Sequence, residues 1–312
     1  MDARPDGGAP QTSGPAGKRL ILRVRWGPMA YARAVVEPGG VLRVGRLASH
    51  ADFVVPHDRQ MAKVHFELSW DGARCLLRDR AGVAGTDLTA PTKLNGESVS
   101  DQAEVRNGAY LGAGETIFSV YVEEATPVRP EDEMGAETTP TKARALAALE
   151  AEPEPLFAVL DAGRCRRVAE VLRESVEEHR SLYEGIKGEA LAEVAPYLVS
   201  LPRACRLLPR LVREGWGKRW GIYLTSSRPF SEVRSHLRRF LRIVDEVSQK
   251  PLYFRFYDPG VLRVFLTTCT VRQRSDFLGE LGGYVAEGET GEVLRFGAAP
   301  ATRTSPAPPG MI

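Results

Sequence analysis

The sequence has no paired cysteines and no long apolar run, and its charges nearly cancel. None of its four cysteines forms a Cys-x-x-Cys pair, which argues against a disulfide framework or a metal site. No apolar run approaches the roughly 20 residues that a membrane-spanning helix needs. A formal net charge of +2 over 312 residues gives no footprint of nucleic-acid binding. We therefore expect no cofactor, no nucleic-acid partner and no membrane span.

The two ends of the chain also have few apolar side chains. Residues 1–18 are mostly Gly, Pro, Ala and polar residues and lack the apolar segment of a secretory signal. Residues 298–312 are rich in Ala and Pro. We expect both segments to be disordered tails and the protein to be cytoplasmic.

A complete catalytic motif is missing as well. There is no Gly-x-Ser-x-Gly elbow around Ser226 or Ser227, no glycine-rich phosphate loop with its lysine, and no His-Glu-x-x-His. We therefore expect a protein that is not an enzyme.

Between the tails the hydrophobic pattern changes, which predicts a multidomain chain. Residues 19–122 carry short apolar runs at the spacing of an all-β sandwich. Residues 123–154 are rich in proline and acidic residues and predict a linker, with a possible short helix at 142–150. Residues 155–297 alternate strands with helices. This predicts an α/β domain with a largely parallel sheet flanked by helices.

Four short motifs in the first domain lie in the order found in a known family. They are Val44-Gly45-Arg46, Lys63-Val64-His65, Leu94-Asn95-Gly96 and the run from Gly112 to Phe118. In order and approximate spacing they resemble the forkhead-associated (FHA) domain. The resemblance implies a phosphothreonine-reading surface, here containing Arg46, Lys63, Thr92 and Asn95, because a guanidinium fork can hold phosphate.

Two phosphate contacts of that family are missing. The family carries Ser three residues before the His, where this chain has Ala62, and a loop Asn, where it has Ala84 or Ala90 depending on the alignment. Each lost charge-assisted hydrogen bond is worth about 1.5 to 3 kcal/mol. We therefore expect weak or lost phosphothreonine reading. His65 is expected to brace the loop, and Arg46 either holds phosphate or forms a scaffold salt bridge.

The predicted parallel sheet carries polar residues after its strands. Asp161, the segment 225–227 and Asp258 would lie together, because ligands of such sheets bind outside the carboxyl ends of the strands. A hydrolase or phosphate-processing enzyme that uses these carboxylates is therefore the alternative function. Helix capping by Asp161 and Asp258 is the competing explanation, and Pro259 at a first helical position favours it.

The segment 216–259 holds the most distinctive motifs of the second domain. Two Trp-Gly steps at Trp216 and Trp220 precede the string His236 to Leu241 and the run Phe254 to Pro259. Together they resemble the effector-chaperone family of bacterial type VI secretion, the Tap or TEC adaptors. The matching positions are Trp216, Trp220, His236, Arg238, Arg239, Arg255, Tyr257 and Asp258. The family has Arg after the Asp-Pro pair, whereas this chain has Gly260.

The resemblance implies an adaptor that binds an effector toxin and loads it onto the VgrG spike protein. The FHA-like domain would add a phosphoprotein or a component of the secretion machine as a partner. A phosphothreonine-dependent signalling or scaffold protein is a further alternative.

A helix predicted over 231–245 has an arginine face opposite its apolar stripe. Ser231 and Glu232 are expected to cap this helix, and Arg234, Arg238 and Arg242 form the face. That face either is solvated or meets an acidic partner. Trp216 and Trp220 are either core residues or interface anchors.

Overall fold

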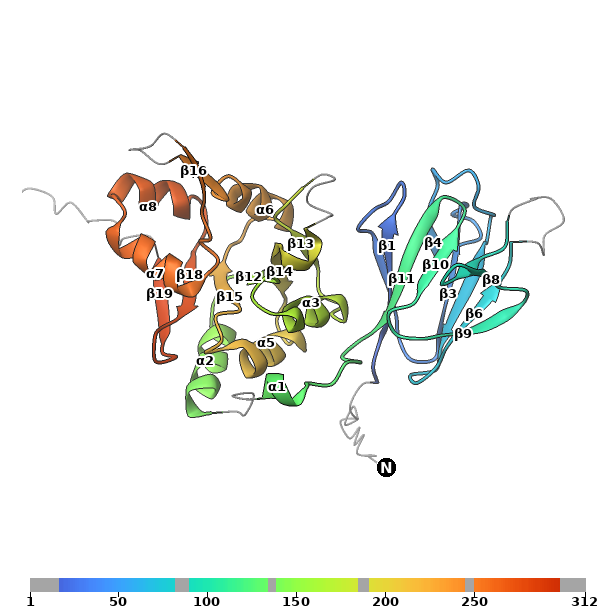
Figure 1. Cartoon of the computed structure of the whole chain (residues 1–312), viewed down its shortest axis with the longest axis horizontal. Coiled ribbons are helices and arrows are strands. Elements are labelled where there is room, and N and C mark those ends of the chain that lie inside the picture. Colours follow the sequence, from blue (N-terminus) through green and yellow to red (C-terminus); the bar gives the residue numbers. More distant parts are fainter. Residues whose placement is uncertain (1–16, 82–89, 134–138, 185–190, 245–249, 298–312) are drawn as a thin grey trace, which may run out of the picture. The chain divides into compact units, whose positions relative to one another are not determined.

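The computed structural model describes residues 17–81, 90–133, 139–184, 191–244 and 250–297. The chain divides into two compact units, residues 1–125 and residues 126–312 (Figure 1). The expected tails at 1–18 and 298–312 lie outside the described residues, except for Gly17 and Lys18.

The first unit is a sandwich of two β-sheets, as the short apolar runs predicted. One sheet has the order β2-β1-β11-β10-β7-β8 and the other β4-β3-β5-β6-β9. The strands are β1 (Leu20–Trp26), β2 (Arg33–Val36), β3 (Gly40–Gly45), β4 (Phe53–Val54), β5 (Phe66–Trp70), β6 (Cys75–Asp79), β7 (Lys93–Leu94), β8 (Glu97–Ser98), β9 (Gln102–Val105), β10 (Tyr110–Ala113) and β11 (Thr116–Val122).

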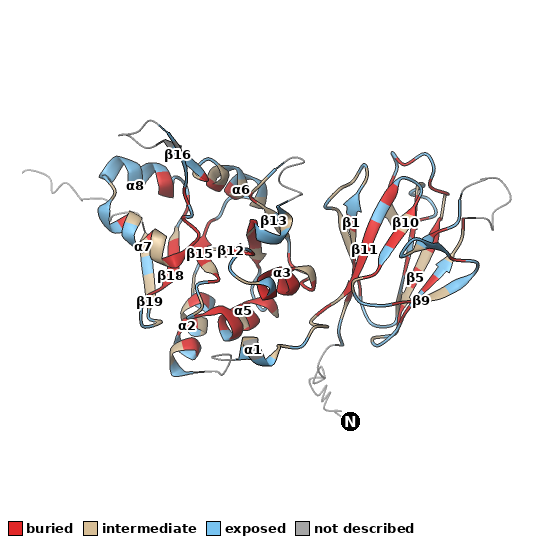
Figure 2. Ribbon diagram, viewed as in Figure 1, coloured by how far each residue is buried: buried red, intermediate tan, exposed pale blue. Residues whose placement is uncertain are grey.

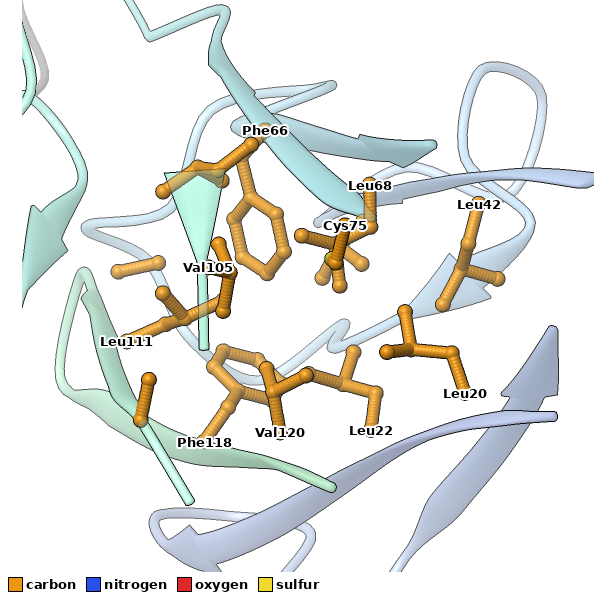
Figure 3. Packing of buried hydrophobic residues seen from close by; sticks show 14 of the residues in the cluster. Leu20, Leu22, Leu42, Phe66, Leu68, Cys75, Val105, Leu111, Phe118 and Val120 are labelled. Atoms are coloured by element: carbon orange, nitrogen blue, oxygen red, sulfur yellow. The ribbon is translucent and has the colours of Figure 1, made fainter. Parts of the chain in front are cut away.

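The core of this unit lies between the two sheets. Alternate residues of each strand point inward, because side chains of a strand alternate between its faces. Leu20 and Leu22 of one sheet meet Phe66 and Leu68 of the other, and Phe118 packs edge-on against Phe66 (Figure 3). Tight turns join the strands, as at Asp71-Gly72, where Gly72 has a φ of +102°.

The second unit is a six-stranded sheet with helices on both faces. Its strands are β12 (Leu156–Asp161), β13 (His179–Ser181), β14 (Pro196–Leu201), β15 (Gly221–Thr225), β18 (Gly283–Glu287) and β19 (Val293–Gly297), and β16 (Arg242–Val244) pairs with β17 (Pro251–Tyr253) in a separate ribbon. Its helices are α1 (Pro130–Glu133), α2 (Pro140–Glu150), α3 (Arg166–Arg173), the 3-10 helix η1 (Ala192–Val194), α5 (Leu207–Gly215), α6 (Phe230–Arg238), α7 (Pro259–Thr268) and α8 (Val271–Leu278).

Strand β12 is buried along its whole length, which explains its uninterrupted apolar run (Figure 2). Leu156, Ala158 and Leu160 pack with α2, α3 and α5 on one face of the sheet. Phe157 and Val159 pack with α6, α7 and α8 on the other face. Each face contributes a separate apolar core, so the sheet forms the middle of three layers.

The expected parallel direction of this sheet is wrong: all its neighbouring strands run antiparallel, in the order β13-β14-β12-β15-β18-β19. Strands β14 and β15, joined through α5, do point the same way, since both are antiparallel to β12. However, β12 lies between them. A continuous apolar run predicts that a strand is buried on both faces, but it does not predict which strands become its neighbours in the sheet.

The expected linker at 123–154 also differs from the structure. The division between the units falls after Ala125. The helix expected at 142–150 forms as α2, and its Ala145 and Leu149 are buried in the core of the second unit. Thr126 donates hydrogen bonds to Glu174, and Arg129 pairs with Glu170. Most of the described residues from 126 to 154 therefore belong to the second unit.

The helix expected over 231–245 ends at Arg238. Ile243 and Arg242 belong instead to β16, which pairs with β17, because the β-branched side chains there favour a strand. Ser231 does not cap this helix, since the residue at the cap is Pro229 and no side chain accepts its first N–H groups. The expected arginine face therefore loses Arg242.

Candidate interaction surfaces

The first unit presents Arg46 and Lys63 from adjacent backbone segments. Strand β3 ends at Gly45, where a Cβ would lie 2.1 Å from the carbonyl oxygen of Lys63. Only glycine allows the two segments to approach this closely. Arg46 is partly buried and donates through Nε to the carbonyl of Met61 at 3.0 Å. Lys63 is also partly buried.

His65 braces the loop between these two residues. It is buried, and its Nδ1 accepts the backbone N–H of Ala62 at 3.1 Å, so its Nε2 carries the proton. Burial lowers the pKa of His65, although Asp79 and Asp58 oppose this. Ala62 is buried and has no hydroxyl to offer a ligand. Of the two possible positions of the missing Asn, Ala84 lies outside the described residues and Ala90 is exposed.

Thr92 is buried in structural contacts, whereas Asn95 is exposed and also holds a turn. Thr92 is fully buried, and its hydroxyl donates to the carboxylate of Asp79 at 2.6 Å, so it cannot touch a ligand at the surface. Asn95 occupies a left-handed position in the turn between β7 and β8. Its side-chain oxygen accepts the backbone N–H of Tyr110 at 2.9 Å. Of the four residues expected at this surface, Thr92 is thus the one that burial removes from reach of a ligand.

In the second unit, the turn from Trp216 to Gly221 is held mainly by buried contacts. Trp216 is buried and donates its indole N–H to Gly291 at 2.7 Å, and Trp220 is buried against Gly215. Gly221 lies against β12, where a Cβ would come within 2.1 Å of the carbonyl oxygen of Val159. The two tryptophans are therefore core residues, the first of the two alternatives.

Glu287 holds the middle of the turn between Trp216 and Gly221. Its buried carboxylate accepts the backbone N–H groups of Gly217 at 2.5 Å and of Arg219 at 2.7 Å. Burial raises the pKa of Glu287, against the opposing effect of these hydrogen bonds. Arg219 adopts a φ of +57°, and its side chain leaves the turn toward solvent.

Asp258 and Asp161 each pair with an arginine. Asp258 caps α7 by accepting the N–H groups of Gly260 at 2.8 Å and Val261 at 3.2 Å, and it forms an ion pair with Arg219. Burial acts to raise the pKa of Asp258, but Arg219 and the two N–H groups outweigh it and lower this pKa. Asp161 pairs with Arg255. The expected capping role of Asp258 is confirmed.

Asp161 is not a helix cap. Helix α3 begins at Arg166, and the cap residue is Cys165, with no side-chain hydrogen bond. Asp161 instead closes the turn after β12 by accepting the N–H of Gly163 at 3.0 Å. Four residues of irregular chain therefore separate Asp161 from α3, an interruption that the sequence pattern did not reveal.

The polar segment 225–227 lies at the opposite end of the sheet from Asp161. Because β12 and β15 are antiparallel, Thr225 pairs with Leu156 at one end while Gly221 pairs with Leu160 near Asp161. The carboxylates and the hydroxyls proposed for the enzyme alternative are thus not brought together. Within the described ranges, no three His, Cys, Asp or Glu side chains are placed to hold a metal ion.

The arginines of α6 are occupied by backbone contacts. Arg234 donates to the carbonyl of Ser181 at 2.8 Å, and Arg238 donates to that of Leu182 at 3.0 Å. Both also pair with Glu184. Their face therefore anchors the chain after β13, which is neither of the two roles that the sequence suggested.

His236 also has a structural position. Its Nε2 donates to the carbonyl of Phe277 at 2.9 Å, and its Nδ1 accepts from Arg239 at 2.6 Å. Burial lowers the pKa of His236, and Arg239 lowers it further, while the bond to Phe277 opposes them. His236 therefore links α6 to α8, and Arg239 holds the His236 ring in place.

A cluster of tyrosines lies next to Arg255. The guanidinium of Arg255 lies 5.9 Å from the centroid of the Tyr257 ring. Tyr183 and Tyr253 pack edge-on with ring centroids 5.9 Å apart. Burial raises the pKa of Tyr257 and of Tyr253, and contacts with Tyr183 act in the same direction. Sequence reasoning missed Arg219, Tyr183 and Tyr253, because their neighbours come from distant parts of the chain.

Comparison with family models assigns both units. Residues 42–114 match the model of the FHA domain, and residues 156–276 match the one described as Domain of unknown function (DUF4123). A comparison with curated proteins found no match. Among the described residues, no helix is long and apolar enough to cross a membrane.

Several solved structures are similar to part of the chain. The FHA domain of the CT664 protein from Chlamydia trachomatis is 19% identical, with a TM-score of 0.29, and the match covers 33% of this chain and 96% of that one. The FHA domain of an Arabidopsis thaliana hypothetical protein is 21% identical, with a TM-score of 0.32, over 38% of this chain and 98% of that one. The cytoplasmic domain of the T3SS sorting platform protein PscD from P. aeruginosa is 20% identical, with a TM-score of 0.29, over 35% and 86% of the two chains.

The family models and the sequence motifs agree on both units. The chain carries an FHA domain at residues 42–114, followed at residues 156–276 by a DUF4123 domain, which is an effector-adaptor-type domain of type VI secretion.

Proposed function

We propose that this protein is a non-enzymatic adaptor, which binds an effector toxin in the cytoplasm and delivers it to the VgrG spike. The observation that carries the proposal is the DUF4123 match over residues 156–276. The FHA domain adds a protein-interaction module, since FHA domains bind phosphoproteins. In this proposal it recruits either a phosphoprotein or a component of the secretion machine.

The contacts of Asp258 and Asp161, the two carboxylates of the enzyme alternative, support a role without catalysis. Asp258 is engaged by two backbone N–H groups and Arg219, and Asp161 by one N–H group and Arg255. A general base needs an accessible carboxylate within hydrogen-bond reach of its substrate. Both carboxylates are almost fully buried beneath their arginines, so neither is placed for that task.

The test is co-purification of the full chain with a candidate effector toxin and a VgrG spike protein, chosen from the genes that neighbour its own. We expect the toxin to stay soluble and to be captured with the chain, and the spike protein to join the complex. The matched control is the FHA variant Arg46→Ala, which leaves the DUF4123 domain intact and is expected to capture the same toxin.

One pair of results would reverse the proposal. If neither protein associates at micromolar concentration, and the purified chain turns over a substrate in a manner that depends on Asp258, the enzyme alternative replaces the adaptor.

A further inference from the structure

Two partly exposed arginines lie at one end of strands β12 and β15, each held by a buried carboxylate. The side chain of Arg219 is 46% exposed and pairs with Asp258, which is 9% exposed. The side chain of Arg255 is 49% exposed and pairs with Asp161, which is 4% exposed. Both carboxylates thus lie beneath their arginines, and the groups that reach solvent are the guanidinium groups.

The two pairs belong to one surface. The N–H of Asp161 donates to the carbonyl of Trp220 at 2.8 Å, which places the end of β12 beside Arg219. Asp258 also acts electrostatically on Arg255. Arg164, in the turn after β12, is exposed and adds a third cation, with its Nε 3.4 Å from the carbonyl of Lys218. We call Arg164, Arg219 and Arg255 the arginine edge.

Tyrosine side chains lie next to this surface. Tyr257 is buried beneath the guanidinium of Arg255, and Tyr253, which is half-exposed, packs beside Tyr183. Arginine and tyrosine are the residues enriched in the energetically dominant centres of protein interfaces. Arg219 and Arg255 are fixed by buried carboxylates, and an aromatic ring also lies against Arg255, unlike charged residues that only keep a surface solvated.

The geometry also leaves binding capacity on both arginines. A guanidinium has five N–H donors. Among the described residues, one nitrogen of Arg219 donates to Asp258 and one nitrogen of Arg255 donates to Asp161, and no other side-chain acceptor contacts either group. The remaining donors can hold a second carboxylate. Because the buried acid already fixes each guanidinium, little side-chain entropy is lost on binding.

We propose that the arginine edge, with the half-exposed Tyr253 beside it, docks a carboxylate-rich segment of the protein that this adaptor carries. This inference rests on the proposed adaptor function and names the surface and the chemistry of the partner. Charge complementarity identifies the occupant, since three cations reach solvent here while the carboxylates lie below them.

The test removes each arginine together with its buried acid. The double variants Arg219→Ala/Asp258→Asn and Arg255→Ala/Asp161→Asn leave no unpaired buried charge and keep the net charge of the chain. Asparagine retains an oxygen that can accept the N–H groups of Gly260 or Gly163. The matched control is Arg272→Ala/Asp276→Asn, which removes an exposed ion pair from α8. Circular dichroism and thermal unfolding establish that each variant is folded.

The probe is a labelled peptide rich in glutamate, titrated into the full chain by fluorescence anisotropy, with its glutamine counterpart as the reference. We expect the affinity for the glutamate peptide to fall about threefold in each double variant and about tenfold when both are combined, because exposed ion pairs are individually weak. The control variant and Arg46→Ala are expected to bind as the unmodified chain does. The salt dependence of binding should weaken along with the affinity.

Two results would overturn the proposal. One is equal binding of the glutamate peptide by the combined variant and the control. The other is displacement of the peptide by inorganic phosphate or single-stranded DNA at equal concentration, which would make this edge a general anion site. Capture of the toxin distinguishes a failure of this docking surface from a failure of the adaptor function. If the combined variant captures the toxin as well as the unmodified chain does, the docking surface is wrong while the adaptor function stands.

Discussion

Arg219 reaches from the turn before β15 to pair with Asp258, the residue that caps α7. Its guanidinium lies over Gly260, where a Cβ would come within 2.7 Å of Nη2. The adaptor family that the sequence resembles is expected to have Arg after the Asp-Pro pair, and here Arg219, from elsewhere in the chain, occupies the space above Gly260. A side chain at position 260 would therefore collide with the guanidinium of Arg219, so Gly260 leaves the room that Arg219 needs to reach Asp258.

Replacing Asp258 should destabilise the second unit through its cap. Asp258→Ala removes the acceptor of two N–H groups and should lower the free energy of unfolding by about 1 kcal/mol, whereas Asp258→Asn should cost less. Urea denaturation measures both. The pKa of Asp258 is lowered, so its contribution is complete above the ordinary value of 3.8 and is lost as pH falls below it. Equal stability of the alanine variant and the unmodified chain would contradict the assigned cap.

The stability of the second unit should also depend on His236 at mildly acidic pH. The pKa of His236 is lowered below its ordinary value of 6.5, chiefly by burial. The unfolded chain therefore binds the proton first, and the free energy of unfolding is highest above that value and falls as pH decreases. We expect His236→Gln to flatten this dependence. Denaturation at several pH values, followed by fluorescence, measures the slope; an unchanged slope would mean that other groups cause it.

Gly45 should tolerate no larger residue. The Cβ of Gly45→Ala would lie 2.1 Å from the backbone oxygen of Lys63, so β3 or the Lys63 segment must move. We expect a loss of about 1 to 3 kcal/mol or more in the first unit. The control is Gly112→Ala in β10, where the nearest atom is a side-chain carbon 3.6 Å away. Similar stability of the two variants would show that this close approach is not maintained in solution.

The boundary between the units predicts which fragments fold. A fragment of residues 126–297 keeps α2, whose Leu149 is buried, and the ion pair between Arg129 and Glu170. A fragment of residues 155–297 loses both. Burial of one leucine alone is worth about 1.5 to 3 kcal/mol, so we expect the shorter fragment to be less stable by at least that amount. Thermal unfolding compares the two, and equal stability would restore the linker interpretation.

The FHA domain should bind phosphothreonine peptides weakly at best. Ala62 offers no hydroxyl and Thr92 is buried, so Arg46 and Lys63 are the expected surface residues that carry a positive charge to meet phosphate. We expect Arg46→Ala to abolish the residual affinity for the phosphorylated peptide. In the unmodified chain, Ala62→Ser should raise that affinity, because it supplies the missing hydroxyl. Isothermal titration with phosphorylated and unphosphorylated peptides measures this. Tight binding that survives Arg46→Ala would assign the recognition to other residues.

The sequence by itself determined both domain types and the local structure that depends on nearest neighbours. Period-two runs gave the sandwich, and the cap at Asp258 followed from its place before Pro259. The burial of β12 on both faces followed from its continuous apolar run. In each case, the physical cause is contained in a few consecutive residues.

Only the tertiary structure decided which distant residues meet. Strand β12 lies between β14 and β15, which makes the sheet antiparallel and sends Asp161 and the segment 225–227 to opposite ends. The pairing of Arg219 with Asp258 spans 39 positions, and that of Arg255 with Asp161 spans 94. Local propensity and periodicity carry no information on such pairs, because strand order and helix packing determine them only after the chain has closed its core.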